Sequence, residues 1–244
     1  SCLVGSEMCI RDRIRTLGLR DLFYPIYSHT LLKIHQKKQN KLFNGSNKEL
    51  LYVVDDVLGK YEYPFWLNYG TLLGAYRDHD FIKHDNDLDI GMYWEDRQNV
   101  KELLISAGLK LLSIITYGDS DAPESSEYRF EYNGVYIDIN FYTVKDGVAT
   151  TYNPLFYSNK DYNIMGEAIP VKVEKVDSPF TGLKKIFFVG REFYVPSNTK
   201  EYLIANYGEN FMIPVSNFDY HDYALNITAY SEKEKLGSFC RYNL

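Results

Sequence analysis

The chain has 244 residues, of which 45% are hydrophobic and 25% are charged, so it can bury a sizeable globular core. Its net charge of -6 and pI near 5.4 argue against a nucleic-acid partner, because binding to a phosphate backbone depends on clustered Lys and Arg. Three cysteines do not make a disulfide framework, so we expect a reducing, cytoplasmic compartment. The sequence has no apolar run of the roughly 18 to 20 residues that a membrane-spanning helix needs.

The N-terminal part is predicted to be helical. Residues 1–13 have no periodicity and resemble translated adapter sequence, so we predict a non-native leader and exclude it from the fold. Apolar residues then recur at helical spacing through 14–62, which predicts one helix over 14–38 and a second capped by Asn47. An anchor upstream of Ser1 is left open, and with it the lumen of the Golgi as the alternative location.

A strand-turn-helix corner follows. Phe65–Tyr69 has the composition of a buried strand, and Gly70 and Thr71 turn it into a short helix. Such a corner presents backbone N–H groups and the positive end of the helix dipole to an anion. A Gly-Thr pair alone is more often an ordinary turn, so its value depends on what lies next to it.

Three acidic residues come next in the chain. Asp85, Asp87 and Asp89 alternate with other residue types in the period of a strand, so their carboxylates share one face. Neighbours two apart on a strand lie roughly 6.6 Å apart, so like charges raise each other's pKa unless a cation lies between them. Carboxylate oxygens without His or Cys suit Mg²⁺ or Mn²⁺. A solvated acidic loop is the alternative, and Ile90 and Met92 disfavour it because they extend the strand.

The middle of the chain alternates helix, strand and loop. Asp96–Ala107 has the apolar spacing of an amphipathic helix that Gly108 ends. The segment 109–116 is strand-like and apolar, whereas Gly118–Ser126 is polar and acidic and is predicted to be a loop.

A hairpin is predicted after that loop. Tyr128–Tyr132 and Val135–Tyr142 flank Asn133-Gly134, a favoured two-residue turn. Asp138 lies on the polar face of the second arm, and on a strand next to the Asp87–Asp89 strand it would be about 5 Å away across the sheet. The alternative is an edge-strand residue that faces water.

At this point the chain resembles a known family. The run from Gly70 to Arg77, followed by His84–Ile90, is similar to the LicD-type phosphotransferases, the group that includes fukutin and fukutin-related protein. The stretch from Val195 to Pro214 resembles the closing motif of that family. One departure lies before the acidic run, where His79, Asp80 and Lys83 replace the common Gly and Pro, so the loop that enters the site is expected to differ.

The resemblance implies an α+β fold of the nucleotidyltransferase type. We expect a mixed β-sheet core with N-terminal helices and a C-terminal helical cap. The implied domains are N-terminal helices at 14–62, a catalytic domain at 63–214 and a C-terminal extension at 215–244.

It also implies metal-dependent transfer of a phospho-alcohol, such as phosphocholine or phosphoribitol, from a CDP-linked donor to a glycan hydroxyl. The implied site consists of a metal pair with a third carboxylate, and of residues around the donor phosphates: Asp87, Asp89 and Asp138 for Mg²⁺ or Mn²⁺, and Gly70, Thr71 and Arg77 for the phosphates. Arg129 is a further candidate for binding the transferring phosphoryl group, with a surface cross-strand position as the alternative.

Two other functions remain open. A nucleotide-sugar glycosyltransferase of the Asp-x-Asp type would explain Asp87 and Asp89, but it gives no role to Gly70, Thr71 or Asp138. A non-catalytic domain that binds nucleotide or glycan would keep the fold without the reaction.

Overall fold

The computed structural model describes residues 46–83, 85–119, 122–155, 166, 168–215, 218–229 and 236–242. All of them lie in one compact unit, Leu42–Leu244. The predicted leader at 1–13 and the predicted helix at 14–38 lie outside the described residues. The second predicted helix is present over 46–60. The N-cap prediction for Asn47 was wrong, because residue 46 is already helical and the Asn47 side chain accepts from the amide of Lys48.

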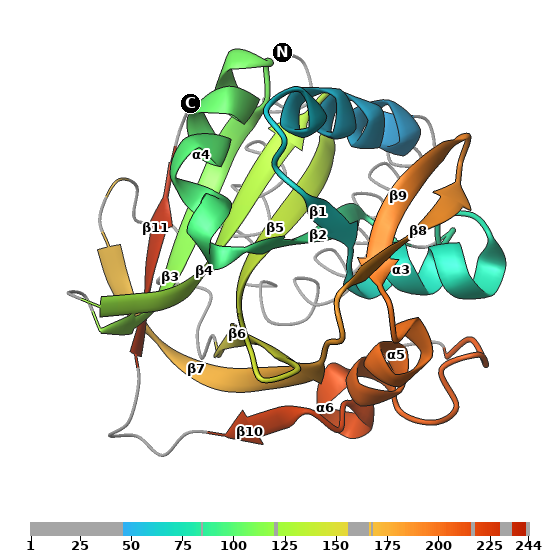
Figure 1. Ribbon diagram of the computed structural model, residues 1–244. Helices are drawn as coiled ribbons and strands as arrows, with labels where there is room; N and C mark the ends of the chain where they lie inside the picture. Colours follow the sequence, from blue (N-terminus) through green and yellow to red (C-terminus); the bar gives the residue numbers. More distant parts are fainter. Residues whose placement is uncertain are drawn as a thin grey trace, which may run out of the picture. The chain divides into compact units, whose positions relative to one another are not determined.

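The structure mixes helices with a larger number of strands (Figure 1). The strands are β1 (Phe65–Leu67), β2 (Asp87–Tyr93), β3 (Lys110–Asp119), β4 (Ala122–Tyr132), β5 (Val135–Lys145), β6 (Val148–Leu155), β7 (Ala168–Pro179), β8 (Leu183–Phe188), β9 (Arg191–Pro196), β10 (Ile227–Ala229) and β11 (Leu236–Arg241). The helices are α3 (Tyr69–Leu73), α4 (Arg97–Ser106), α5 (Thr199–Tyr207) and α6 (Tyr220–Tyr223), with a π-helical turn at Gly74–Asp78 and a 3₁₀ turn at Trp94–Asp96.

Within the described part of the chain these strands form one mixed sheet. β2 pairs with β5 in parallel, and β1 pairs with β9 in parallel, whereas the other pairs are antiparallel. The open part of the sheet runs β5, β2, β1, β9, β8. A mixed sheet was expected, and this arrangement places the two strands that carry the predicted carboxylates side by side.

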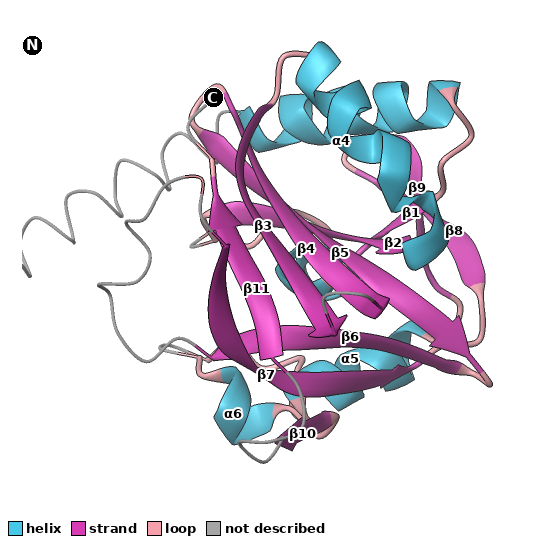
Figure 2. Cartoon of the chain, turned by 90° about the vertical axis from the view of Figure 1, so that its left-hand side faces the viewer, coloured by secondary structure: helices cyan, strands magenta, loops and turns pink. Residues whose placement is uncertain are grey.

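Part of the sheet closes on itself. β3 pairs with β4, β4 with β5, β5 with β6, β6 with β7, β7 with β11, and β11 with β3 again. These strands therefore form a closed, barrel-like ring, which we call the strand ring (Figure 2). A small apolar cluster that includes Tyr117, Tyr152 and Phe239 is contributed by its strands. The ring shares β5 with the open sheet, so β5 is paired on both of its sides.

The main core lies along the open sheet and the first strands of the ring. Trp66, Ile90 and Ile137 are fully buried there, together with Leu50 of the helix at 46–60 and Leu104 of α4. Figure 2 shows α4 and α5 on opposite sides of the strands. Successive side chains of a strand point to opposite faces of the sheet. Because the apolar residues of β2 and β5 fill the core on one face, the other face is left for polar residues.

Local predictions held where the pattern was strong. The hairpin across Asn133-Gly134 is present, and both residues have positive φ (50° and 82°), as a two-residue turn of this kind needs. The amphipathic helix is present as α4, and Gly108 after it has φ 93°. The loop predicted at Gly118–Ser126 was wrong, because β4 already begins at Ala122. The polar composition favoured a loop, but β4 pairs with both β3 and β5. The buried hydroxyl of Ser125 also donates to the carbonyl of Phe141, which satisfies a polar side chain inside the sheet.

Two other boundaries differ from expectation. The strand predicted at Phe65–Tyr69 ends at Leu67, and Tyr69 starts α3 with a positive φ of 33°. The helical cap expected toward the C-terminus is represented by α5 and α6, but β10 and β11 then return to the sheet. Their partners are β7 and β3, which no local pattern in the sequence reveals.

Gly91 of β2 has no room for a side chain. It faces Trp66 on β1, and a Cβ added there would overlap the Trp66 indole. Because Trp66 is fully buried, the indole cannot move aside, so Gly91→Ala should lower the free energy of unfolding by roughly 1–3 kcal/mol. Urea denaturation followed by tryptophan fluorescence measures it, with Gly59→Ala as the control because nothing lies within 4 Å of a Cβ there. Equal midpoints for the two variants would contradict the packing described here.

Candidate active site

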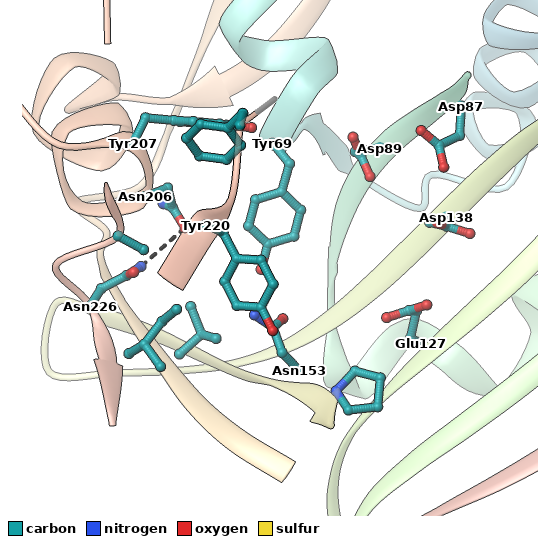
Figure 3. Close-up of a pocket in the computed structure, with 15 residues that line it drawn as sticks. Tyr69, Asp87, Asp89, Glu127, Asp138, Asn153, Asn206, Tyr207, Tyr220 and Asn226 are labelled. Carbon is teal, nitrogen blue, oxygen red and sulfur yellow. Dashed lines mark hydrogen bonds between the residues drawn. The ribbon is translucent and has the colours of Figure 1, made fainter. Parts of the chain in front are cut away.

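The acidic residues of β2 and β5 meet at one place in the sheet. The parallel register pairs Asp89 directly with Asp138. Asp87 lies two residues before Asp89 on the same strand, so its side chain leaves the same face. The adjacency of the strands is therefore confirmed, and the three predicted carboxylates lie close together (Figure 3).

Gly70 and Thr71 hold Asp89 in position. The amide of Gly70 donates to Asp89 Oδ2 (3.2 Å), and the hydroxyl of Thr71 accepts from the backbone amide of Asp89 (2.8 Å). A Cβ on Gly70 would collide with the carboxylate of Asp85, so the absence of a side chain is what lets Asp85 and Asp89 approach the corner. The turn at Gly70 and Thr71 is thus hydrogen-bonded directly to β2, the strand that carries Asp87 and Asp89.

Burial and mutual repulsion make these carboxyl groups hard to ionise. Burial, followed by the charges of Asp87, Asp85 and Asp138, raises the pKa of Asp89 well above its ordinary value. Burial and Asp87 raise the pKa of Asp85 to about 7. Burial also raises the pKa of Asp138, although Arg129 opposes the shift. The site is therefore one that a cation would stabilise.

Arg129 supplies positive charge among the carboxylates. Its guanidinium lies 3.1 Å from Asp87 Oδ2 and 3.4 Å from Asp138 Oδ2, so it bridges the two strands. Its position on β4 is directly opposite Asp138 on β5, which makes it the cross-strand partner of that residue. Arg77 is placed elsewhere: it pairs with its neighbour Asp78 at 2.8 Å and does not line the cavity described below.

Glu127 is a site residue that the sequence analysis missed. It lies two residues before Arg129 on β4, lines the same cavity, and accepts hydrogen bonds from Asn140 (3.3 Å) and Tyr117 (3.4 Å). Burial raises its pKa, and Arg129 opposes that shift. The alternation of Ser125, Glu127 and Arg129 was visible in the sequence, but the predicted strand began only after Glu127.

A buried polar network behind the carboxylates was missed as well. Asn68 is fully buried between β1 and α3, donates to the hydroxyl of Tyr142 (2.9 Å), and accepts from the hydroxyl of Tyr202 (2.8 Å). Its backbone amide donates to the carbonyl of Asp89 (3.0 Å). One asparagine therefore ties β2, β5 and α5 together behind the site.

A cavity of about 520 Å³ opens in front of the carboxylates. One side of it, the acidic wall, consists of Asp87, Asp89, Glu127 and Asp138. The other side, the neutral wall, carries amide, aromatic and aliphatic side chains from β6, β7, α5, β10 and the segment around α6: Asn153, Pro154, Val176, Asn206, Tyr207, Phe218, Tyr220, Ala224, Asn226 and Ile227. Tyr69 also lines the cavity, and Figure 3 shows the two walls on either side. A volume of this size suits a small-molecule ligand.

The ligand types at the acidic wall suit a hard divalent cation. All the charged groups there except Arg129 are carboxylates, and Asp138 Oδ1 is buried with no hydrogen-bond donor among the described residues. In the described part of the chain, no three His, Cys, Asp or Glu side chains gather as closely as a bound metal requires. Arg129 is the cation that balances the carboxylates in this arrangement. The residue types therefore suit Mg²⁺ or Mn²⁺, but the carboxylates are not drawn together as around a bound ion, and Arg129 is the competing charge.

Comparison with known proteins places the chain in a family. The sequence model described as "LicD/FKTN/FKRP, nucleotidyltransferase domain" matches residues 62–198, which is more than half of the chain. The chain belongs to the LicD/FKTN/FKRP family. The matched region contains the Gly-Thr corner, β2 and β5, and therefore the whole acidic wall.

Curated relatives of this LicD/FKTN/FKRP member carry transferase names. The chain is 31% identical over 182 residues to "Ribitol-5-phosphate transferase FKTN" of Homo sapiens, which covers 73% of this chain and 36% of that protein. It is 30% identical over 190 residues to the Mus musculus protein of the same name, covering 76% and 37%. It is 32% identical over 89 residues to "Ribitol 5-phosphate transferase FKRP" of Homo sapiens, covering 35% and 18%. The chain thus spans little more than a third of the FKTN proteins it matches.

Among the described residues, every helix is too short or too polar to cross a bilayer.

Proposed function

We propose that this chain transfers a phospho-alcohol from a CDP-linked donor to a glycan hydroxyl, with a divalent cation, on a sheet core of the nucleotidyltransferase type. The observation that carries the proposal is the meeting of Asp87, Asp89 and Asp138 on one wall of the cavity, with the Arg129 guanidinium against two of them. The names of the FKTN relatives and the family match support the reaction class.

The bond changes in the proposed reaction are simple. The oxygen of the acceptor hydroxyl forms a bond to the phosphorus that carries the alcohol, and the bond from that phosphorus to the bridging oxygen of the pyrophosphate breaks. CMP leaves, and the proton of the hydroxyl passes to a carboxylate. Asp138 is the proposed acceptor of that proton, or alternatively a ligand of the cation, because its Oδ1 receives no hydrogen bond from any described residue.

The other residues bind and orient. Asp87 and Asp89, joined by Asp138 where it acts as a ligand and not as the base, would hold the Mg²⁺ or Mn²⁺, which when bound supplies Lewis-acid stabilisation of phosphate charge. Gly70 and Thr71 keep Asp89 in place through the two hydrogen bonds described above. Arg129 is proposed to bind the transferring phosphoryl group when it is released from Asp87 and Asp138. Arg77 is left out of the proposal, since its guanidinium is paired with Asp78.

Product analysis tests the proposal. The protein is incubated with Mg²⁺, a CDP-linked alcohol and a glycan acceptor, and the nucleotide product is identified by chromatography and mass spectrometry. CMP together with a glycan phosphodiester supports the proposal. A nucleoside diphosphate with a glycoside, from a nucleotide sugar, would show a glycosyltransferase instead, and binding without turnover would show a non-catalytic domain.

Gly70→Ala should separate site geometry from stability. A methyl group there meets the ends of the Asp85 and Asp89 side chains, so the carboxylates must shift while the backbone stays. We expect turnover to fall by up to roughly 100-fold, as a displacement of about 1 Å at a reacting group can produce, with a melting temperature within a few degrees of wild type. Gly59→Ala, with open space around it, is the control that should keep both. Unchanged turnover in Gly70→Ala would count against these carboxylates.

A further inference from the structure

The neutral wall of the cavity has no role in the reaction proposed above. Among the described residues that line the cavity, the charged ones all belong to the acidic wall. The neutral wall offers aromatic rings from Tyr207, Phe218 and Tyr220, and amides that include Asn206 and Asn226. Most of it comes from residues after 198, beyond the segment that matches the family. A part of a ligand that carries no charge would fit this side.

The hydrogen bonds of the wall fix the orientation of its amides. Asn206 donates from Nδ2 to the backbone carbonyl of Tyr202 (2.8 Å), so its Oδ1 must point the other way. That Oδ1 accepts from Asn226 Nδ2 (3.0 Å), which also donates to the hydroxyl of Ser178 (2.9 Å). Both hydrogen bonds of Asn226 Nδ2 therefore go to other residues of the protein. These bonds determine which atom of the amide is the oxygen and which is the nitrogen.

The remaining atom of this network is a hydrogen-bond acceptor without a donor. Asn226 Oδ1 is buried and receives no hydrogen bond from any described residue. A buried acceptor left unpaired is costly, so a donor from a ligand would be stabilised there. Because the oxygen is covered by its neighbours, the side chains around it must adjust slightly as the donor enters.

Aromatic rings next to an amide acceptor are the usual elements of nucleobase recognition. Bases stack on Tyr or Phe rings, and amide groups contact their hydrogen-bonding edges. An acceptor oxygen favours a base with an exocyclic amino group, which cytosine, adenine and guanine carry and uracil lacks. Uracil presents a carbonyl oxygen at the corresponding place, and two acceptors facing each other repel.

We propose that the neutral wall is a nucleobase subsite in which Asn226 Oδ1 accepts from the amino group of the base and Tyr220 supplies a stacking surface. The proposal rests on the proposed function, because it places the base of the donor beside an acidic wall that receives the phosphates. It assigns the choice of nucleotide to residues 206–227, whereas the reacting groups belong to β2, β4 and β5.

Titration calorimetry with CMP, AMP and UMP in the presence of Mg²⁺ tests the assignment. Wild type should bind CMP or AMP roughly 10-fold or more tightly than UMP, as one well-placed base contact allows. Asn226→Ala should remove that preference, and Tyr220→Ala should weaken all nucleotides that bind by a similar factor of roughly 10. Leu225→Ala is the control, since Leu225 is 67% exposed and does not line the cavity.

The outcomes separate this inference from the proposed function. Inorganic pyrophosphate with Mg²⁺ probes the acidic wall alone. If pyrophosphate binds but wild type does not distinguish UMP from CMP and AMP, the nucleobase subsite is wrong and the proposed function stands. A preference that survives in Asn226→Ala would also overturn the assignment, and the wild-type comparison stays decisive if that variant does not fold. Failure of both pyrophosphate and nucleotides to bind would overturn both proposals.

Discussion

Asp89→Asn is expected to abolish transfer and to leave the metal-free protein at least as stable as wild type. Asp89 is partly buried, and its pKa is raised by burial and by three neighbouring carboxylates, so its ionised form is a cost to the folded state. Asparagine keeps the shape and an oxygen for the amide of Gly70, and it removes the repulsion, which is roughly 1–3 kcal/mol per pair at ~6 Å and an effective dielectric of ~20 to 40. Turnover should fall by ~10³-fold or more, since a charge-stabilising group is lost.

Melting curves without and with Mg²⁺ decide this prediction for Asp87→Asn, Asp89→Asn and Asp138→Asn. Wild type should gain about 2.7 kcal/mol at one hundred times the Kd of the ion, and the variants should gain much less. Asp146→Asn, at an exposed turn position with φ 51°, is the control that should behave like wild type. Strong destabilisation of all three site variants without metal would mean that these carboxylates are structural groups.

Arg129→Gln should have the opposite effect on the metal-free protein. Without the guanidinium, Asp87 and Asp138 lose the charge that now lies 3.1 and 3.4 Å from them. Removing one partner of a buried ion pair costs about 3–5 kcal/mol, and because Arg129 keeps 36% exposure we expect roughly 2 kcal/mol here. Mg²⁺ should restore most of the stability and bind more tightly than to wild type, because its competing cation is gone. Turnover should fall because the phosphoryl group loses its bidentate partner.

A double mutant isolates the coupling between these residues. If Arg129 stabilises the apo site through Asp138, then Asp138→Asn should recover part of the stability lost in Arg129→Gln, and the interaction free energy follows from the cycle. Arg129→Lys keeps the charge without the fork and should retain more stability than activity. Additive effects in the cycle, or metal binding weakened by Arg129→Gln, would contradict the role of Arg129 as the competing cation.

The sequence was most informative where a local pattern and a strand period agreed. Asn133-Gly134 requires a turn with positive φ, so the hairpin that carries Asp138 was predictable from two residues and their flanks. The alternation around Asp87 and Asp89 fixed their common face. That β2 would pair with β5 was an inference from the family resemblance and the isolated carboxylate at 138, and the register of the sheet confirms it.

What the sequence could not provide depends on contacts between distant segments. Glu127 was missed because the polar run before it favoured a loop, whereas pairing of β4 on both sides makes it a strand. Asn68 gave no signal, because its importance lies in hydrogen bonds to Tyr142 and Tyr202. The neutral wall joins residues from β6, β7, α5, α6 and β10, and no periodicity relates Asn226 to Asn206.

The strand ring also sets an order of events while the protein is made. β11 is the last strand of the ring to leave the ribosome, and until it arrives both β3 and β7 carry unpaired N–H and C=O groups along one edge. Pairing between segments so far apart in the chain forms slowly. The nascent chain therefore passes through a stage in which two open strand edges can join to other chains, and we expect chaperones that cover them until β11 is in place to raise the yield of folded protein.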